Sequence, residues 1–229
     1  MKKSRLVYLA VAAAVAAAAV YGVVRYRAYV RDCADRDGAR QLKEFYRLAG
    51  NGYPDKAAQA KMRDVMAEME KTMQKCSSGT YEALFGRCLD GAFIIGDYAK
   101  AESLMDGLPG RSENWRNGAK AKIRAHAALE KGDKAAAISE FQAFLESVKA
   151  EPGEMNEIDP YTGTEWTKDM IVAHNLKRMG DLSADIGKTG DAARYRAEAK
   201  ALFDQALKAA GDDQEMKDAI IKCAGDLLK

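Results

Sequence analysis

Four methionines lie at intervals that could hold a soft metal ion on one helix. They are Met62, Met66, Met69 and Met73. Steps of four, three and four residues place their thioethers on one side of a helix, and thioether sulfur is a ligand for Cu(I). Methionine is also a flexible filler of hydrophobic cores, and the same stripe would pack against Leu42 and Phe45. We favour the core interpretation and predict no metal site.

The remaining candidates for catalysis are few. The two histidines, His126 and His174, belong to no metal-binding motif such as His-Glu-x-x-His. The chain has no Lys-Ser/Thr after its Gly-Asp pairs, as a phosphate-binding loop would require, and no nucleophile elbow. Glu157 and Asp159 are the only candidates for the carboxylate pair of a hydrolase, and such pairs are common on solvated loops. We therefore predict no enzyme activity and no cofactor.

Four cysteines, Cys33, Cys76, Cys88 and Cys223, lack the Cys-x-x-Cys spacing typical of zinc sites. In an antiparallel helical hairpin the start of the first helix lies beside the end of the second, which brings Cys33 near Cys76. Cys88 lies two turns inside its helix and is a less suitable partner. We predict a Cys33–Cys76 disulfide, with four reduced thiols as the alternative.

Composition indicates a folded helical protein that does not bind nucleic acid. The 229 residues are 48% apolar and 31% charged, with only 4 prolines. The net charge of +2 includes six basic residues that flank the first apolar segment: Lys2, Lys3, Arg5, Arg25, Arg27 and Arg31. Without these six, 30 basic residues face 34 acidic ones, a net charge of −4. A nucleic-acid-binding surface needs the opposite sign.

An uncharged segment of nineteen residues, 6–24, consists mostly of alanine and valine. About 20 apolar residues cross a bilayer as an α-helix, so the segment is just long enough for a membrane anchor. A cleaved signal peptide is the alternative, with Ala16 to Ala18 before the cut. That cut would leave an apolar stretch on the mature end, so we favour an uncleaved anchor over residues 1–31. A buried helix of a soluble protein is a third interpretation.

Basic residues lie on both sides of this segment, so the positive-inside rule gives no clear orientation. We expect the body, residues 32–229, to lie outside the cytoplasm, which in a bacterium is the periplasm. Tyr21, Tyr26 and Tyr29 would then lie near one membrane interface, as aromatic belts do. If the segment is cleaved, the same body is a secreted soluble protein.

The body is predicted to be all-α, built from stacked antiparallel helical hairpins. Apolar residues recur at helical spacing, with breaks at glycine or proline, and Asp55 can cap the helix after Pro54. The segment 151–165 fits no helix, carries five acidic residues and no basic one, and is predicted to be an insertion. The expected helices span about 39–48, 56–74, 81–95, 99–108, 115–131, 134–150, 166–186, 191–210 and 214–228. The last one is expected to cap the stack through one apolar stripe of Met216, Ile220, Cys223, Ala224 and Leu227.

Gly-Asp pairs at 96–97, 132–133 and 190–191 indicate turns between paired helices. The first interval, 36 residues, is close to a helical-hairpin repeat, and the second, 58 residues, includes the acidic insertion. The residues in register with the turns are Tyr98 and Ala101, then Ala137, Phe141 and Phe144, then, one helical turn late, Ala199, Phe203 and Ala206. This pattern resembles the tetratricopeptide-repeat family, and the resemblance implies a superhelix of hairpins over residues 39–210.

The resemblance also implies a binding groove along the first helices of the repeats. The groove positions of the family correspond here to Asp90, Phe93, Ile94, Lys122, His126, Leu129 and Glu130, with Tyr46 and Lys177 as extensions. A rival site is the acidic segment, with Glu154, Glu157, Asp159 and Tyr161, because long irregular segments are often functional.

The sequence therefore predicts a membrane-anchored, non-catalytic scaffold in the cell envelope that binds a protein or peptide partner. In overall plan the chain is similar to single-anchor bacterial envelope proteins with a periplasmic repeat domain. The alternative is a structural or assembly component that self-associates as a homo-oligomer.

Overall fold

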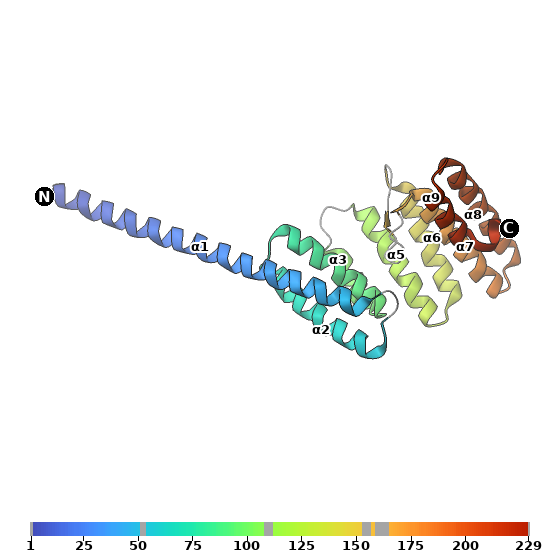
Figure 1. The fold of residues 1–229 in the computed structure, drawn as a ribbon, viewed down its shortest axis with the longest axis horizontal. Helices are drawn as coiled ribbons and strands as arrows, with labels where there is room; N and C mark the ends of the chain where they lie inside the picture. The colour runs from blue at the N-terminus through green and yellow to red at the C-terminus, as the bar shows by residue number, and fades with distance from the viewer. Residues whose placement is uncertain (1, 51–53, 108–111, 153–156, 159–164, 229) are drawn as a thin grey trace. The chain divides into compact units, whose positions relative to one another are not determined.

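The computed structural model describes residues 2–50, 54–107, 112–152, 157–158 and 165–228, and their side chains from residue 20 onward except at 157, 158 and 165. In this part of the chain the protein is all-α with packed helix pairs, apart from one short pair of strands (Figure 1). The helices are α1 (Lys2–Ala49), α2 (Lys56–Met73), α3 (Ser78–Ile94), α4 (Tyr98–Asp106), α5 (Glu113–Glu130), α6 (Lys134–Ala150), α7 (Lys168–Asp185), α8 (Thr189–Ala209) and α9 (Gln214–Ala224), followed by a 3-10 turn at Gly225–Leu228.

The chain divides into two compact units, residues 1–95 and 96–229. The predicted division into an anchor, residues 1–31, and a repeat domain, residues 32–229, stays a prediction. The boundary between the units separates the two helices of the predicted second hairpin, because α3 belongs to the first unit and α4 to the second.

In the first unit α1 is one unbroken helix that extends well beyond α2 and α3 (Figure 1). The separate helix expected at 39–48 is therefore the last part of α1. Neither proline nor a positive-φ residue interrupts α1, and Gly38 is buried against Thr80 and Leu84 of α3. Where side chains are described, no helix is both long enough and apolar enough to cross a membrane. Residues 6–19 of the predicted anchor lie outside that part.

The methionine stripe of α2 lies in the core of the first unit. Met62, Met66 and Met69 are at most 4% exposed, and Asp55 caps this helix as predicted, with its Oδ1 accepting from Ala58 N at 2.7 Å. A methyl group on Gly91 of α3 would lie 2.6 Å from Sδ of Met66. These packed surroundings fit the core interpretation of the stripe.

The cysteines of the first unit are free thiols in the structure, as is Cys223 in the second. Cys33 Sγ accepts from Arg36 Nη2 at 3.3 Å, and Cys76 Sγ donates to the Met73 carbonyl at 3.7 Å. The predicted Cys33–Cys76 bridge is thus not formed in the structure, although Asp35 does bond to Ser77 nearby.

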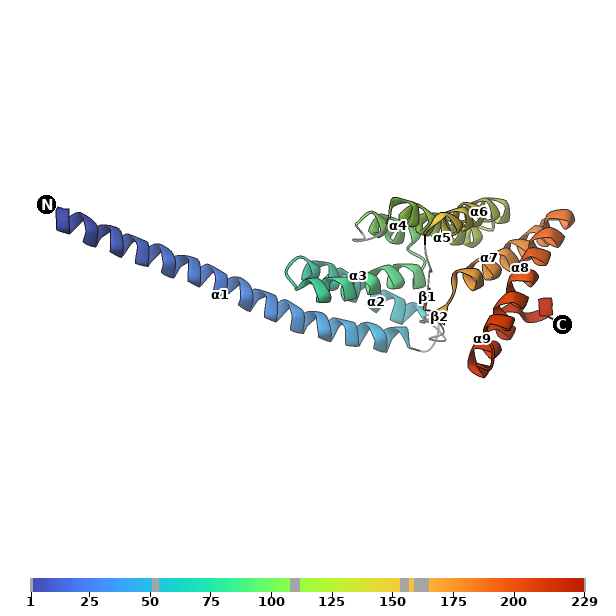
Figure 2. The same ribbon diagram turned by 90° about the horizontal axis from the view of Figure 1, so that it is seen from above.

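In the second unit each helix from α4 to α9 packs on the next (Figure 2). Helices α5 to α9 share one hydrophobic core. Phe141 and Phe203 are fully buried in it. Helices α5 and α6 approach each other closely at Gly118, where a methyl group would lie 2.2 Å from Oγ of Ser147. The predicted stripe of α9 packs on this core, with Ile220 and Ala224 buried.

The turn between α7 and α8 falls within the predicted break at 187–190, at its first residue and not at the Gly190-Asp191 pair. Gly187, not Gly190, has a positive φ of 77°, the same value as Gly132. At both glycines the next residue donates to the carbonyl five positions back, as Lys188 N does to Ser183 O at 2.8 Å. Gly190 lies in the first turn of α8, so the expected turn at 190–191 is wrong.

The predicted insertion at 151–165 is non-helical where the structure describes it. β1 (Glu157–Ile158), within the segment, pairs antiparallel with β2 (Glu165–Trp166), which begins at the last residue of the segment. The rival site residues Glu154, Asp159 and Tyr161 lie outside the described residues, as does the side chain of Glu157.

Candidate binding face on helices α5 and α7

Helices α5 and α7 each carry a pair of polar side chains, and the two pairs have the same spacing along the chain. Lys122 and His126 are four residues apart on α5, and His174 and Arg178 are four apart on α7, so each pair lies on one side of its helix. Arg178 Nη1 lies 3.2 Å from Nε2 of His126 and joins the two helices. We call these four residues the α5–α7 face.

The two cations of this face, Lys122 and Arg178, each lie over an aromatic ring, and we call them ring-supported. The Arg178 guanidinium lies over the buried ring of Phe141, 5.0 Å from its centroid, and Lys122 Nζ lies 5.3 Å from the centroid of Phe144. Ring faces attract cations and hold them in position. Phe141 also meets the edge of His126, with 5.7 Å between centroids. The cations are therefore held by contacts within the unit.

His126 carries no charge at neutral pH. Burial lowers its pKa to about 3, helped by the positive charges of Arg178 and Lys122 and by His174. Arginine can only donate, so Nε2 of His126 accepts from Arg178 and the ring proton is on Nδ1. A base this weak is unsuited to proton abstraction near pH 7, and the ring instead acts as a neutral acceptor that positions Arg178.

Trp166 extends the face at the start of α7. Its ring lies edge-on to His174, with 5.0 Å between centroids, and it packs against the core of the second unit. Thr167 caps α7 by accepting from Met170 N at 3.4 Å, which fixes where the helix begins after β2. The chain thus places an aromatic ring beside the histidine end of the face.

The seven predicted groove residues are divided between the units. Lys122 and His126 belong to the α5–α7 face, whereas Leu129 packs against the core and Glu130 is exposed at the end of α5. The other three belong to α3 in the first unit, where Asp90 pairs with Arg87 at 2.9 Å and Phe93 and Ile94 are half-buried.

Of the two weaker candidates, Tyr46 in the first unit is 56% exposed beneath Arg87, and Lys177 in the second pairs with Asp181 at 3.6 Å. Sequence reasoning missed Arg178, His174 and Trp166 as members of a site. The four-residue spacing of His174 and Arg178, which repeats that of Lys122 and His126, is the signal that could have found two of them.

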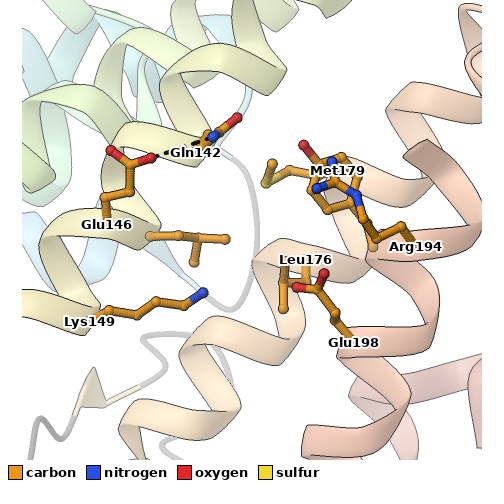
Figure 3. A pocket seen from close by; sticks show the side chains of 9 residues that line it. Gln142, Glu146, Lys149, Leu176, Met179, Arg194 and Glu198 are labelled. Carbon is orange, nitrogen blue, oxygen red and sulfur yellow. Dashed lines mark hydrogen bonds between the residues drawn. The ribbon is translucent and has the colours of Figure 1, made fainter. Parts of the chain in front are cut away.

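A small hollow lies between α6, α7 and α8 of the same unit (Figure 3). Leu145, Leu176, Met179 and Tyr195 form its apolar lining, with Gln142, Glu146, Lys149, Arg194 and Glu198 around them. Its volume of about 150 Å³ is below the ~300–1,000 Å³ of small-molecule sites. The charges of two cations and two carboxylates on the rim cancel. The hollow therefore favours neither positively nor negatively charged ligands.

A scan against protein-family models finds no match for this chain, and a search among curated proteins finds none either. The protein can therefore be described by its fold class and by the geometry of the α5–α7 face, without a family. The protein is an all-α chain of packed helix pairs, with two cations packed on aromatic rings and a neutral, half-buried imidazole on one face of its second unit.

Proposed function

We propose that this protein is a membrane-anchored, non-catalytic scaffold of the cell envelope that binds an acidic segment of a protein partner on its α5–α7 face. The anchor is residues 6–24, whose uncharged run has the length of a bilayer-crossing helix. The body lies outside the cytoplasm, and it acts by holding a partner near the membrane.

The tetratricopeptide-like arrangement is part of this proposal. Helices of similar length follow one another as α5, α6, α7 and α8, with 18, 17, 18 and 21 residues. A buried alanine follows each turn glycine by five residues, at Ala137 after Gly132 and at Ala192 after Gly187. Such a repeated contact supports regular stacking of hairpins, and regular stacks expose long faces that suit extended peptides.

The observation that carries the proposal is the pair of ring-supported cations, Lys122 and Arg178, on either side of an uncharged His126. A planar guanidinium can bind a carboxylate with two parallel hydrogen bonds, and the ammonium adds a point charge. Because both cations are already positioned, little side-chain entropy is lost on binding. Acidic side chains are the groups that this face recognises best.

Selection of displayed peptides on the full chain in detergent tests this function. We expect the selected peptides to be rich in Asp and Glu, and Lys122→Glu/Arg178→Glu to weaken binding of the best one by about 100-fold, since each close charge pair contributes on the order of 1–2 kcal/mol. Isothermal titration at low and high salt measures the loss.

The matched control is Lys188→Glu/Lys208→Glu, which changes the charge equally at two exposed positions of the same unit. It should bind the peptide as the wild type does. Selection of peptides without acidic residues, or equal loss in both double variants, would argue against the α5–α7 face. Mass measurement by light scattering on the same samples reports whether the chain self-associates instead.

A further inference from the structure

The large apolar residues that remain exposed are concentrated in one short part of α1. Among the described residues eight large hydrophobic side chains are exposed, and six of them lie between residues 20 and 29. They are Val20, Tyr21, Val23, Val24, Tyr26 and Tyr29, each more than half exposed. A cluster of exposed apolar side chains on a protein surface indicates contact with an apolar environment, such as a lipid bilayer or another protein.

Basic residues are interleaved with these side chains and surround the helix. Tyr21, Arg25 and Tyr29 share one side at four-residue steps, with the Arg25 guanidinium 5.6 Å from the Tyr21 ring centroid. Arg27 and Arg31 share another side. A helix lying in the plane of a membrane separates its apolar and basic residues onto opposite faces, and α1 does not. The pattern is that of a helix that passes through the headgroup layer.

The first unit begins close above this layer because α1 continues into its core. Ala34 and Gly38 are already buried, and Asp35 accepts from Ser77 N at 2.8 Å and from Ser77 Oγ at 3.0 Å. The α2–α3 turn is therefore level with residue 35. At 1.5 Å per residue this is about 16 Å beyond the end of the uncharged run, and headgroups occupy roughly 5–8 Å of that length.

Positive charge predominates at this end of the first unit. Arg25, Arg27, Arg31, Arg36, Lys71 and Lys75 are all exposed there. The carboxylates nearby are engaged in part, since Asp35 bonds to Ser77 and Glu68 pairs with Lys71 at 2.7 Å. Asp32 is exposed beside them. At 1.5 Å per residue, Arg25, Arg27 and Arg31 lie about 2–11 Å beyond the uncharged run, and their long side chains reach lipid phosphates while their methylenes stay in the interface.

We propose that residues 25–31 of α1 form a docking surface for the headgroups of anionic phospholipids. The inference rests on the membrane anchor proposed above. Each basic residue near an anionic membrane surface contributes on the order of 1 kcal/mol, so several of them select anionic over zwitterionic lipid. Docking would fix the orientation of the first unit relative to the bilayer.

The test uses the full chain reconstituted in phosphatidylcholine vesicles that contain spin-labelled phosphatidylglycerol or spin-labelled phosphatidylcholine. Electron paramagnetic resonance measures the fraction of each labelled lipid that is immobilised by the protein. We expect association of phosphatidylglycerol to exceed that of phosphatidylcholine at least ~5-fold at low salt, and the ratio to fall toward one at high salt.

Arg25→Gln/Arg27→Gln/Arg31→Gln should lose most of this selectivity while still entering the vesicles. Lys56→Gln/Lys61→Gln/Arg63→Gln, three exposed basic residues on the first half of α2, should keep it. Equal association of both lipids with the wild type, or equal loss in the two triple variants, overturns the docking surface and leaves the anchor standing. Failure of the wild type to enter vesicles overturns the anchor and the docking surface together.

Discussion

Replacing Gly118 with alanine should destabilise the second unit by about 1–3 kcal/mol, although alanine is the better helix former. The new methyl group would lie 2.2 Å from Oγ and 2.6 Å from Cβ of Ser147. Overpacking of this kind costs roughly 1–3 kcal/mol, and a displaced hydroxyl adds ~1 kcal/mol through its lost hydrogen bond. The gain in helix propensity, about 1 kcal/mol, offsets only part of this.

Ser147 cannot easily move aside, because it is bonded to α5 in two ways. Its Oγ donates to the Asn114 carbonyl at 2.7 Å, and its own carbonyl accepts from Asn114 Nδ2 at 3.0 Å. Removing the obstructing side chain should therefore restore stability. In Gly118→Ala/Ser147→Gly we expect a favourable coupling of about 1–2 kcal/mol relative to the sum of the single changes.

Urea unfolding followed by tryptophan fluorescence measures this effect in the right unit, because both tryptophans of the chain, Trp115 and Trp166, belong to the second one. Gly190→Ala is the matched control: it lies in the first turn of α8, and a methyl group there meets nothing within 4 Å. It should be neutral or slightly stabilising. A Gly118→Ala protein as stable as wild type would mean that α5 and α6 do not approach as closely as described.

Helix content and caps were predictable from the sequence, because they depend on neighbours along the chain. Asp55, Asp97 and Asp133 each accept from a backbone N–H three residues on, as N-cap residues do. The α7–α8 turn was not predictable by the same rule. Two glycines lie three residues apart, and the Gly-Asp pattern favoured Gly190, whereas the backbone bonds that end α7 require the positive φ at Gly187.

With Gly187 as the turn, the α7–α8 hairpin shows the same spacing as the turns at Gly96 and Gly132. Ala192 follows Gly187 by five residues, as Ala101 follows Gly96 and Ala137 follows Gly132, and all three alanines are at most 5% exposed. Ala199, Phe203 and Ala206 were predicted to lie one helical turn late because their positions were counted from Gly190 and not from Gly187. The length of α1 was also missed, because a change in composition near residue 31 does not interrupt a helix whose backbone bonds continue.

For the candidate site, residues on a single helix could be predicted from the sequence, but contacts between helices could not. Lys122 and His126 were predicted as groove positions from the resemblance to tetratricopeptide repeats, but their contact with Arg178 depends on how α7 packs beside them. Burial of His126 also requires Phe141, which comes from the intervening helix α6. Periodicity says which side of a helix is polar, and it does not say which polar sides meet.

Lowering the pH from 7 to 4.5 should destabilise the second unit through His126 by about 2 kcal/mol. The folded ring has a pKa of about 3, against 6.5 for a free histidine. Between these values the unfolded chain binds a proton that the folded protein does not. The stabilisation is therefore fully present above pH 6.5 and is lost as the pH falls toward 3, by ~1.4 kcal/mol per unit.

His126→Gln isolates this contribution, because carboxylates titrate alike in both proteins and glutamine can still accept from Arg178. The stability difference between wild type and variant should shrink by about 2 kcal/mol between pH 7 and 4.5. Ring signals in NMR give the pKa directly, since the chain has only two histidines. Arg178→Gln should raise the pKa of His126, because Arg178 is the strongest charge acting on it after burial. A ring that titrates near 6.5 in the wild type would mean that His126 is open to water, and the cations of the α5–α7 face would then lack their neutral neighbour.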